Sequence, residues 1–227
     1  MEKVLRIMSI IFDLPLDKRD LNKFRGAVIK CAGEQNTLFH NHVESGFNYH
    51  YPLIQYRVIG GNAALVCLNE GIEQAQALFA NGFVGGEIEI GQTKCEVKIN
   101  SIRQNEITLR VINGESKYRV THWLPLNQQN YKTWKDLSKT ERIEQLNKIL
   151  VGNILSFAKG VQWHIGDKIE CSIIPESIKS HHTLYKNQHL IAFTAEFYTN
   201  MILPIGVGLG KSVSLNCGVI MRPQSEL

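Results

Sequence analysis

The sequence lacks the features of several classes of protein. Its 227 residues include only 6 Pro and 5 Cys, with 18 Gly and 20% charged residues, and this composition excludes a collagen-like, disordered or coiled-coil chain. The cysteines are odd in number, scattered along the chain and nowhere spaced C-x-x-C. We therefore expect neither a disulfide framework nor a cysteine zinc site, and a reducing cytoplasm is the expected compartment.

Long hydrophobic runs are also missing. No apolar run approaches the ~20 residues that a membrane helix needs. The first eight residues, MEKVLRIM, carry charges inside their apolar stretch and so lack the core of a signal peptide. We expect no membrane association, and the length suits one large domain or two of about 100 residues each.

An excess of positive charge is present but small, and it is unevenly placed. The chain has 25 Lys+Arg and 21 Asp+Glu, a net charge of +4, whereas residues 116–160 alone contain 8 basic and 3 acidic side chains. Lys and Arg gain free energy by releasing counterions from phosphates, so this basic middle favours a polyanion such as nucleic acid. The alternative is a solvated surface without a partner.

The first half of the chain has the pattern of a mixed α/β domain. The expected elements are strand 4–12, helix 20–32, a hairpin of strands 53–58 and 63–68, helix 71–80, and strands 93–103 and 106–112. Asp20 is the expected cap of the first helix, and Gly60-Gly61-Asn62 is the expected hairpin turn. The resulting order, β-α-β-β-α-β, is ferredoxin-like and is shared by RNA-recognition modules.

The second half is expected to repeat this order. The expected elements are strand 117–123, helix 138–159, strands 168–175, 181–185 and 188–198, and a last strand at 217–221. Ser138 and Glu141 have the spacing of a capping box. A glycine-rich segment occupies the place of a second helix. The predicted fold is therefore α+β, with two tandem ferredoxin-like (RRM-like) domains, 1–115 and 116–227, and a C-terminal glycine-rich loop.

Three imidazoles and two phenols lie close together in a segment that is expected to be a loop. They belong to Phe39-His40-Asn41-His42 and Tyr49-His50-Tyr51. Imidazole titrates near neutrality, so a pair can supply both the base and the acid that RNA cleavage needs. A zinc site and a plain polar loop are the alternatives, but zinc needs further ligands and no Cys or Asp lies nearby.

A second candidate site is Gly206-Val-Gly208-Leu-Gly210-Lys211-Ser212. Glycines let backbone N–H groups approach a phosphate closely, and Lys211 adds positive charge. The spacing fits neither a P-loop nor a dinucleotide-binding fingerprint. The segment is thus either a loop that contacts an RNA backbone or a flexible surface loop.

The segment from Trp123 to Lys135 interleaves aromatic side chains with lysines and amides. Such aromatics can stack on bases. We favour the alternative, in which they hold a connecting segment against the core.

The chain resembles a known family in five blocks that follow one another in the same order. These blocks are Phe39–His42, Tyr51–Tyr56, Trp123–Asn127, Phe157–Gly160, and Leu203-Pro204 with the glycine loop. Together they resemble the CRISPR-associated endoribonucleases of the Cas “six” type, which belong to the repeat-associated mysterious protein superfamily. The resemblance implies two ferredoxin-like domains and metal-independent cleavage of precursor CRISPR RNA within the repeat. The implied products carry a 2′,3′-cyclic phosphate and a 5′-hydroxyl.

The resemblance also implies roles for individual residues. The implied catalytic residues are His40, His42, Tyr51 (or Tyr49) and Lys30; the implied RNA-binding residues are Gly206, Gly208, Gly210, Lys211, Ser212 and Arg25. CRISPR repeat RNA is the implied partner, with a homodimer or a CRISPR effector complex as the two assemblies considered, and no metal or other cofactor is implied.

One stretch departs from the family pattern, and one alternative function stays open. The family loop commonly closes with Gly-Phe-Gly, where this chain has Leu215-Asn216-Cys217-Gly218. The alternative is a non-catalytic subunit of the same fold that holds guide RNA in an effector complex. The histidine pair favours the nuclease, and the basic middle disfavours a third class, a small-molecule-binding protein.

Overall fold

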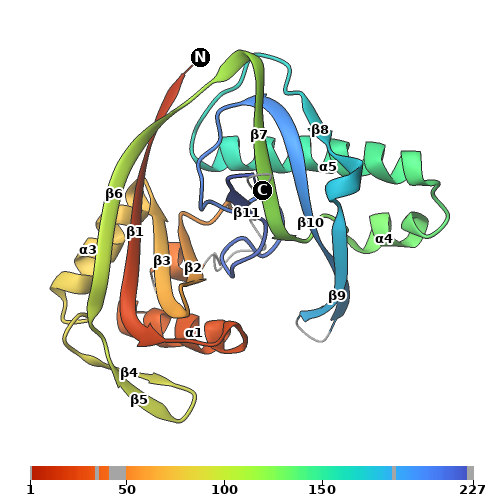
Figure 1. The fold of residues 1–227 in the computed structure, drawn as a ribbon. Helices are drawn as coiled ribbons and strands as arrows, with labels where there is room; N and C mark the ends of the chain where they lie inside the picture. The colour runs from red at the N-terminus through yellow and green to blue at the C-terminus, as the bar shows by residue number, and fades with distance from the viewer. Residues whose placement is uncertain (1, 34–35, 41–49, 186–187, 224–227) are drawn as a thin grey trace. The chain divides into compact units, whose positions relative to one another are not determined.

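The computed structural model describes residues 2–33, 36–40, 50–185 and 188–223 and divides the chain into two compact units (Figure 1). The N-terminal unit contains Val4–Ile107 together with Ser214–Asn216. The C-terminal unit contains Thr108–Val213 and the described residues that precede Val4 or follow Asn216. Residue 115, the boundary expected from the sequence, lies inside a strand of the C-terminal unit.

The N-terminal unit contains one four-stranded sheet and two main helices. Its elements are β1 (Lys3–Pro15), η1 (Lys18–Asp20), α1 (Leu21–Ala32), α2 (Thr37–His40), β2 (Ile54–Ile59), β3 (Asn62–Leu68), α3 (Glu70–Ala80), β4 (Glu87–Ile90), β5 (Thr93–Glu96) and β6 (Ile99–Leu109). The sheet order is β2-β3-β1-β6, and β3 pairs antiparallel with both β1 and β2. The predicted order β-α-β-β-α-β is present in β1, α1, β2, β3, α3 and β6, and the additions to it include α2 and the hairpin β4–β5.

Four phenylalanine rings pack together in this unit. The ring of Phe12 meets the rings of Phe24, Phe79 and Phe83 edge-on, at centroid distances of 5.9, 6.2 and 5.9 Å. Edge-to-face contacts of this kind add to the free energy gained from burial. They fix α1 and α3 against β1, and so fix the elements that flank the candidate site.

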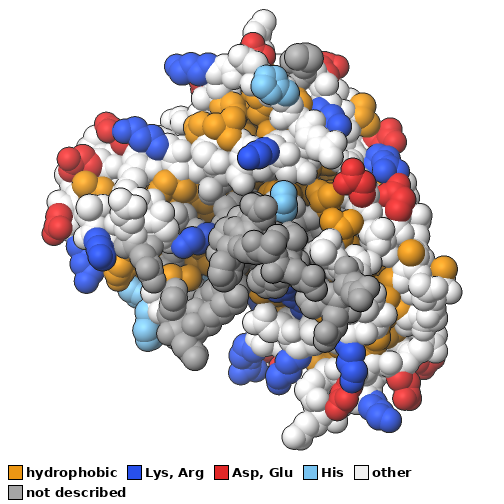
Figure 2. Space-filling model, turned by 180° about the vertical axis from the view of Figure 1, so that it is seen from behind, with side chains coloured by type: hydrophobic (Ala, Val, Ile, Leu, Met, Phe, Trp, Pro, Cys, Tyr) orange, Lys and Arg blue, Asp and Glu red, His pale blue; other side chains and the backbone are white. Residues whose placement is uncertain are grey.

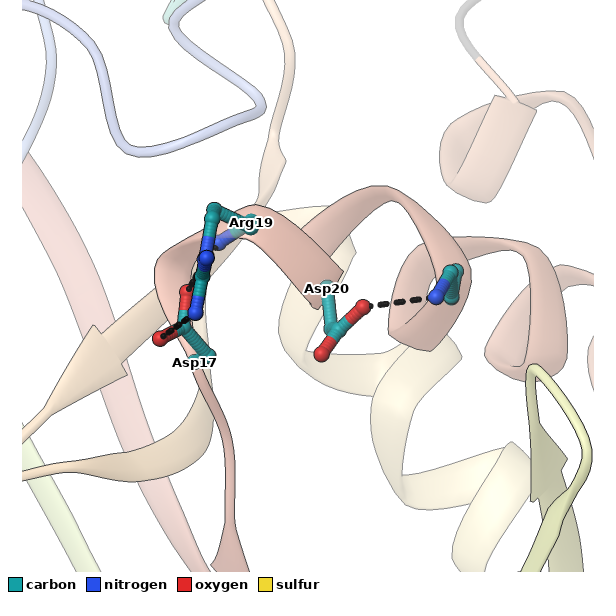
Figure 3. A network of polar contacts seen from close by, with 4 residues as sticks. Asp17, Arg19 and Asp20 are labelled. Atoms are coloured by element: carbon teal, nitrogen blue, oxygen red, sulfur yellow. Dashed lines mark hydrogen bonds and ion pairs between the residues drawn. The ribbon is translucent and has the colours of Figure 1, made fainter.

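The start of α1 differs from the prediction (Figure 3). Asp20 makes no side-chain cap hydrogen bond; instead Asp17 accepts from the Arg19 backbone N–H at 2.8 Å and caps the short η1 turn. Asp20 forms an exposed ion pair with Lys23 at 2.8 Å. The extra turn places the capping carboxylate three residues earlier than the helical periodicity indicates.

The strands predicted at 93–103 and 106–112 are wrong in their bounds. Residues 87–96 form the hairpin β4–β5, closed by Gly91, whose φ of 66° suits a tight turn. The polar run Arg103–Glu106 does not end a strand, because β6 runs continuously from Ile99 to Leu109 with these side chains exposed. An exposed strand lacks the alternation of apolar side chains that would mark it in the sequence.

The C-terminal unit has a five-stranded sheet. Its elements are β7 (Val111–Trp123), α4 (Gln128–Trp134), α5 (Lys139–Gly160), β8 (Cys171–Ile173), η2 (Pro175–Ser177), β9 (Lys179–Tyr185), β10 (Gln188–Met201) and β11 (Val219–Met221). The order is β11-β7-β10-β8, and β9 also pairs with β10. Within the described residues, no helix takes the place between β10 and β11, where the glycine segment stands.

Helix α5 begins as the sequence predicts. The hydroxyl of Ser138 accepts from the Glu141 N–H at 3.3 Å, and the Glu141 carboxylate accepts from the Ser138 N–H at 2.8 Å. This reciprocal pair satisfies two backbone donors that have no partner inside the helix. The helix buries one apolar face, which contains Leu146, Leu150, Ile154, Phe157 and Ala158.

The aromatic segment 123–135 is part of the core. Trp123 is fully buried and donates its indole N–H to the Asn153 side-chain oxygen at 2.8 Å. Trp134 is also buried and meets Phe193 edge-on at 5.6 Å. The interpretation as a connecting segment held against the core is confirmed for these two tryptophans.

The structure also describes the state of the cysteines and the character of the helices. All five cysteines are free thiols. Among the helices of the described residues, none is both long and apolar enough to span a bilayer.

Candidate active site

His40 is the last residue of α2, and Phe39, the residue before it, anchors this short helix to the core of the unit. Phe39 is 1% exposed, and its carbonyl oxygen accepts from the Tyr56 hydroxyl at 3.4 Å. Just before the same helix, the side-chain N–H of Asn36 donates to the Gln74 side-chain oxygen at 2.8 Å. The backbone that carries His40 is therefore attached to both β2 and α3.

His42 and Tyr49 lie outside the described residues, and only the backbone of His40 is described. The pairing of the two imidazoles therefore stays a prediction. His50, where the described chain resumes, is exposed.

Tyr51 is buried, with 9% of its surface exposed, and its hydroxyl oxygen accepts from the Gln55 side-chain N–H at 2.9 Å. Burial raises the pKa of the Tyr51 hydroxyl well above its ordinary value, since the phenolate would lose its hydration. Tyr51 is therefore unsuited to act as a base near neutral pH. Its chemistry is that of a neutral hydrogen-bonding group.

Two polar residues of β2, Gln55 and Arg57, continue the hydrogen-bonded chain that begins at the Tyr51 hydroxyl. Their burial was not predicted from the sequence. Gln55 is 0% exposed and Arg57 is 2% exposed. The Arg57 guanidinium donates to the Gln55 side-chain oxygen and, at 3.2 Å, to the Tyr56 carbonyl. In the sequence, polar residues at alternate positions of a strand are typical of a solvated face, so only the structure shows that this face is buried.

Helix α1 brings Arg25 to the same part of the unit. The Arg25 guanidinium carbon lies 5.9 Å from the centre of the Tyr56 ring, close enough for a cation–π contact. Lys30 is exposed in the last turn of α1. The structure thus connects Arg25, Tyr51 and the His40 backbone through neighbouring residues of β2.

The stretch that departs from the family pattern also pairs with β2 inside the N-terminal unit. The Tyr56 N–H donates to the Ser214 carbonyl at 2.9 Å, and Leu215 forms a parallel bridge with Tyr56. Leu215 therefore has a structural role at the edge of the sheet.

The glycine segment belongs to the C-terminal unit and is held by backbone pairing. The Gly206 N–H donates to the Ile220 carbonyl, and the Leu209 N–H donates to the Gly218 carbonyl, both at 2.8 Å. Gly208 forms an antiparallel bridge with Val219. This pairing gives the segment a fixed conformation, which differs from the predicted alternative of a flexible loop.

Lys211 lies just beyond this paired stretch. Its ammonium donates to the Leu126 carbonyl at 3.3 Å, and burial lowers its pKa. The next residue, Ser212, has a φ of 55°. The described partner of the Lys211 ammonium is a neutral carbonyl oxygen rather than a carboxylate.

The charge on the face drawn in Figure 2 is mixed. Lys and Arg side chains are scattered among acidic ones and orange hydrophobic patches on this face.

Two family models match the chain in order. The Cas6b N-terminal domain matches residues 3–108, and the Cas6b C-terminal domain matches residues 110–223. A curated relative, an uncharacterized protein of Methanocaldococcus jannaschii, is 30% identical in an alignment 128 residues long that covers 50% of this chain and 86% of that protein.

Two solved structures cover almost all of the chain. One, described as a crystal structure of Cas6b, is 28% identical, covers 97% of this chain and 100% of that chain, and has a TM-score of 0.87. The other, described as the CRISPR RNA processing endoribonuclease Cas6b, is 24% identical with the same coverage and a TM-score of 0.75, and it supports the fold alone.

The protein is thus an α+β protein with two sheet-containing domains that match the Cas6 fold. The chain belongs to the Cas6b family.

The glycine segment gives a stability prediction. A Cβ at Gly210 would lie 2.8 Å from the Asn153 side-chain oxygen and 3.0 Å from the Trp123 indole nitrogen, whereas a Cβ at Gly206 would meet nothing within 4 Å. Both glycines have positive φ, 90° and 86°, so both substitutions carry similar backbone strain. We expect Gly210→Ala to lower the free energy of unfolding by about 1–3 kcal/mol more than Gly206→Ala does.

Urea unfolding of the two variants measures this difference. Equal losses of stability would mean that Asn153 and Trp123 move aside at no cost, and that Gly210 is not required for packing.

Proposed function

We propose that this chain is an endoribonuclease that cleaves precursor CRISPR RNA within the repeat. The single observation that carries the proposal is that both Cas6b domain models match, in order, over residues 3–108 and 110–223. The similarity of this chain, over 97% of its length, to the crystal structure of Cas6b that is 28% identical gives further support. We place the reaction in the cytoplasm, in keeping with free cysteines.

In the proposed reaction, the 2′-oxygen attacks the adjacent phosphorus and the bond from phosphorus to the 5′-oxygen breaks. One imidazole of His40 and His42 takes the 2′-hydroxyl proton, and the other donates a proton to the leaving 5′-oxygen. The products are a 2′,3′-cyclic phosphate and a 5′-hydroxyl. Imidazole is suited to both tasks because its ordinary pKa lies near neutrality.

Tyr51, Lys30 and Arg25 are proposed as assisting groups. Tyr51 is proposed as a hydrogen-bond donor to the phosphate, because burial raises its pKa and disfavours the phenolate. Lys30 and Arg25, both on α1, are proposed to offset negative charge on the RNA.

The two domains are proposed to be tandem ferredoxin-like domains with separate tasks. The two sheets contain the strand orders β2-β3-β1-β6 and β8-β10-β7-β11. If the four strands of each order are renumbered 1 to 4 along the chain, both orders become 2-3-1-4. We propose that the N-terminal domain carries the histidines. In the C-terminal domain, the segment Gly206–Ser212 is proposed to contact the RNA backbone, as the pairing with residues 218–220 holds this segment in place.

The first prediction of this proposal concerns the chemistry of cleavage. Proton transfer by imidazoles needs no metal, but the attack needs the 2′-hydroxyl itself. We expect repeat RNA to be cut in the presence of EDTA and to resist cutting when the nucleotide 5′ of the cut is 2′-deoxy. Gel analysis of the product ends measures both effects. A Mg²⁺ requirement, together with cleavage of the 2′-deoxy substrate, would contradict the proposal.

The second prediction concerns the histidine pair. His40→Ala and His42→Ala should each lower the single-turnover cleavage rate by roughly 10²-fold or more, if each imidazole transfers a proton. RNA affinity should change by less than about 1 kcal/mol, because a neutral imidazole contributes at most one modest hydrogen bond. Tyr51→Phe should cost less than either. If both histidine variants cut at the wild-type rate, a guide-RNA-binding subunit becomes the better interpretation.

The third prediction concerns Lys211. Lys211→Ala should weaken RNA binding and flatten the dependence of log Kd on log salt by roughly one unit, without changing which repeat is preferred. Lys168→Ala, which removes an exposed lysine paired with Glu170 at 3.3 Å, is the matched control. Binding titrations at several salt concentrations measure the slope. An unchanged affinity and slope would show that the ammonium does not meet the backbone.

A further inference from the structure

We propose that Gln55 and Arg57 are positioning residues for the cleavage reaction, because they fix Tyr51 and Pro52 at the C-terminal flank of the histidine segment. This inference rests on the proposed function. It assigns a role to two buried polar side chains of β2 that are 0% and 2% exposed.

Arg57 and the Pro52 carbonyl together determine which way the Gln55 amide faces. A guanidinium has only N–H donors, so the Gln55 atom that it contacts must be the acceptor, Oε1. The amide Nε2 must then face the opposite way. There it donates to the Tyr51 hydroxyl oxygen at 2.9 Å and to the Pro52 carbonyl at 3.1 Å.

This orientation sets the direction of the Tyr51 hydrogen bond. Because the Tyr51 oxygen accepts from Gln55, the hydroxyl hydrogen must be donated to a different acceptor. Tyr51 is thereby fixed as a donor, which is the polarity that a phosphate oxygen requires. Burial strengthens this control, since water cannot compete for the amide.

The next residue of β2 holds the other flank of the same segment. The Tyr56 hydroxyl donates to the Phe39 carbonyl, and Phe39 precedes His40. Consecutive residues, Gln55 and Tyr56, thus fix the chain on both sides of the histidines. A reaction that needs an aligned attack is sensitive to such support, since a misplacement of about 1 Å can cost about 10²-fold in rate.

Gln55→Glu is the decisive variant. A carboxylate of the same size still accepts from Arg57, so the buried charge stays paired, but it can no longer donate to Tyr51 or Pro52. We expect the single-turnover cleavage rate to fall at least about tenfold, and the Kd for repeat RNA to stay within about twofold. The thermal unfolding midpoint shows whether the variant is folded.

The matched control is Gln76→Glu on the exposed face of α3, which makes the same chemical change away from the site. It should leave rate and affinity unchanged. A folded Gln55→Glu variant that cuts within twofold of the wild-type rate overturns the inference. So does an equal loss of rate and affinity, which would indicate that Gln55 supports binding alone.

A second pair of variants tests the amide orientation even if Gln55→Glu does not fold. The ammonium in Arg57→Lys can still donate to the Gln55 oxygen, whereas Arg57→Met removes that donor and weakens the hold on the amide. We expect the methionine variant to be about tenfold slower than the lysine variant. Equal rates overturn the inference. A wild-type chain that cuts no repeat RNA overturns the proposed function itself, which distinguishes the two failures.

Discussion

The N-terminal unit depends on the contacts of one tyrosine. Tyr56 packs its ring edge-on against Phe24, lies beneath the guanidinium of Arg25, donates its hydroxyl to Phe39 and donates its backbone N–H to Ser214. Burial raises the pKa of this hydroxyl far above the physiological range, so it stays a donor. A single fully buried residue therefore connects helix α1 and the helix that carries His40 through its side chain, and the stretch 214–216 through its backbone.

Much of the fold could be predicted because it follows from local patterns. The capping box at Ser138 and Glu141 and the helical spacing of Leu146, Leu150 and Ile154 define α5 without tertiary information. The Gly60-Gly61 turn likewise fixes the register of β2 and β3. In each case, the signal lies within a few residues of the feature that it predicts.

Other features could not be predicted, because they depend on the complete fold or on an added turn. A polar side chain at a strand position such as that of Arg57 is typical of a solvated face, yet the fold buries Arg57 and supplies acceptors from Gln55 and the Tyr56 backbone. Asp20 looks like a helix cap, yet an added turn gives that role to Asp17. The candidate site around His40 stays a prediction from residue types, and the hydrogen bonds that support Tyr51 could not be predicted from the sequence.

The bridge between Leu215 and Tyr56 has a consequence for solubility. Strand β2 is the last strand on one side of its sheet, and an unpaired edge offers its backbone groups to any extended chain. Ser214 and Leu215 occupy part of that edge, so they block strand pairing between molecules at Tyr56. A chain that ended before Ser214 would keep β1 to β6 but would present Tyr56 and its neighbours as a template for aggregation.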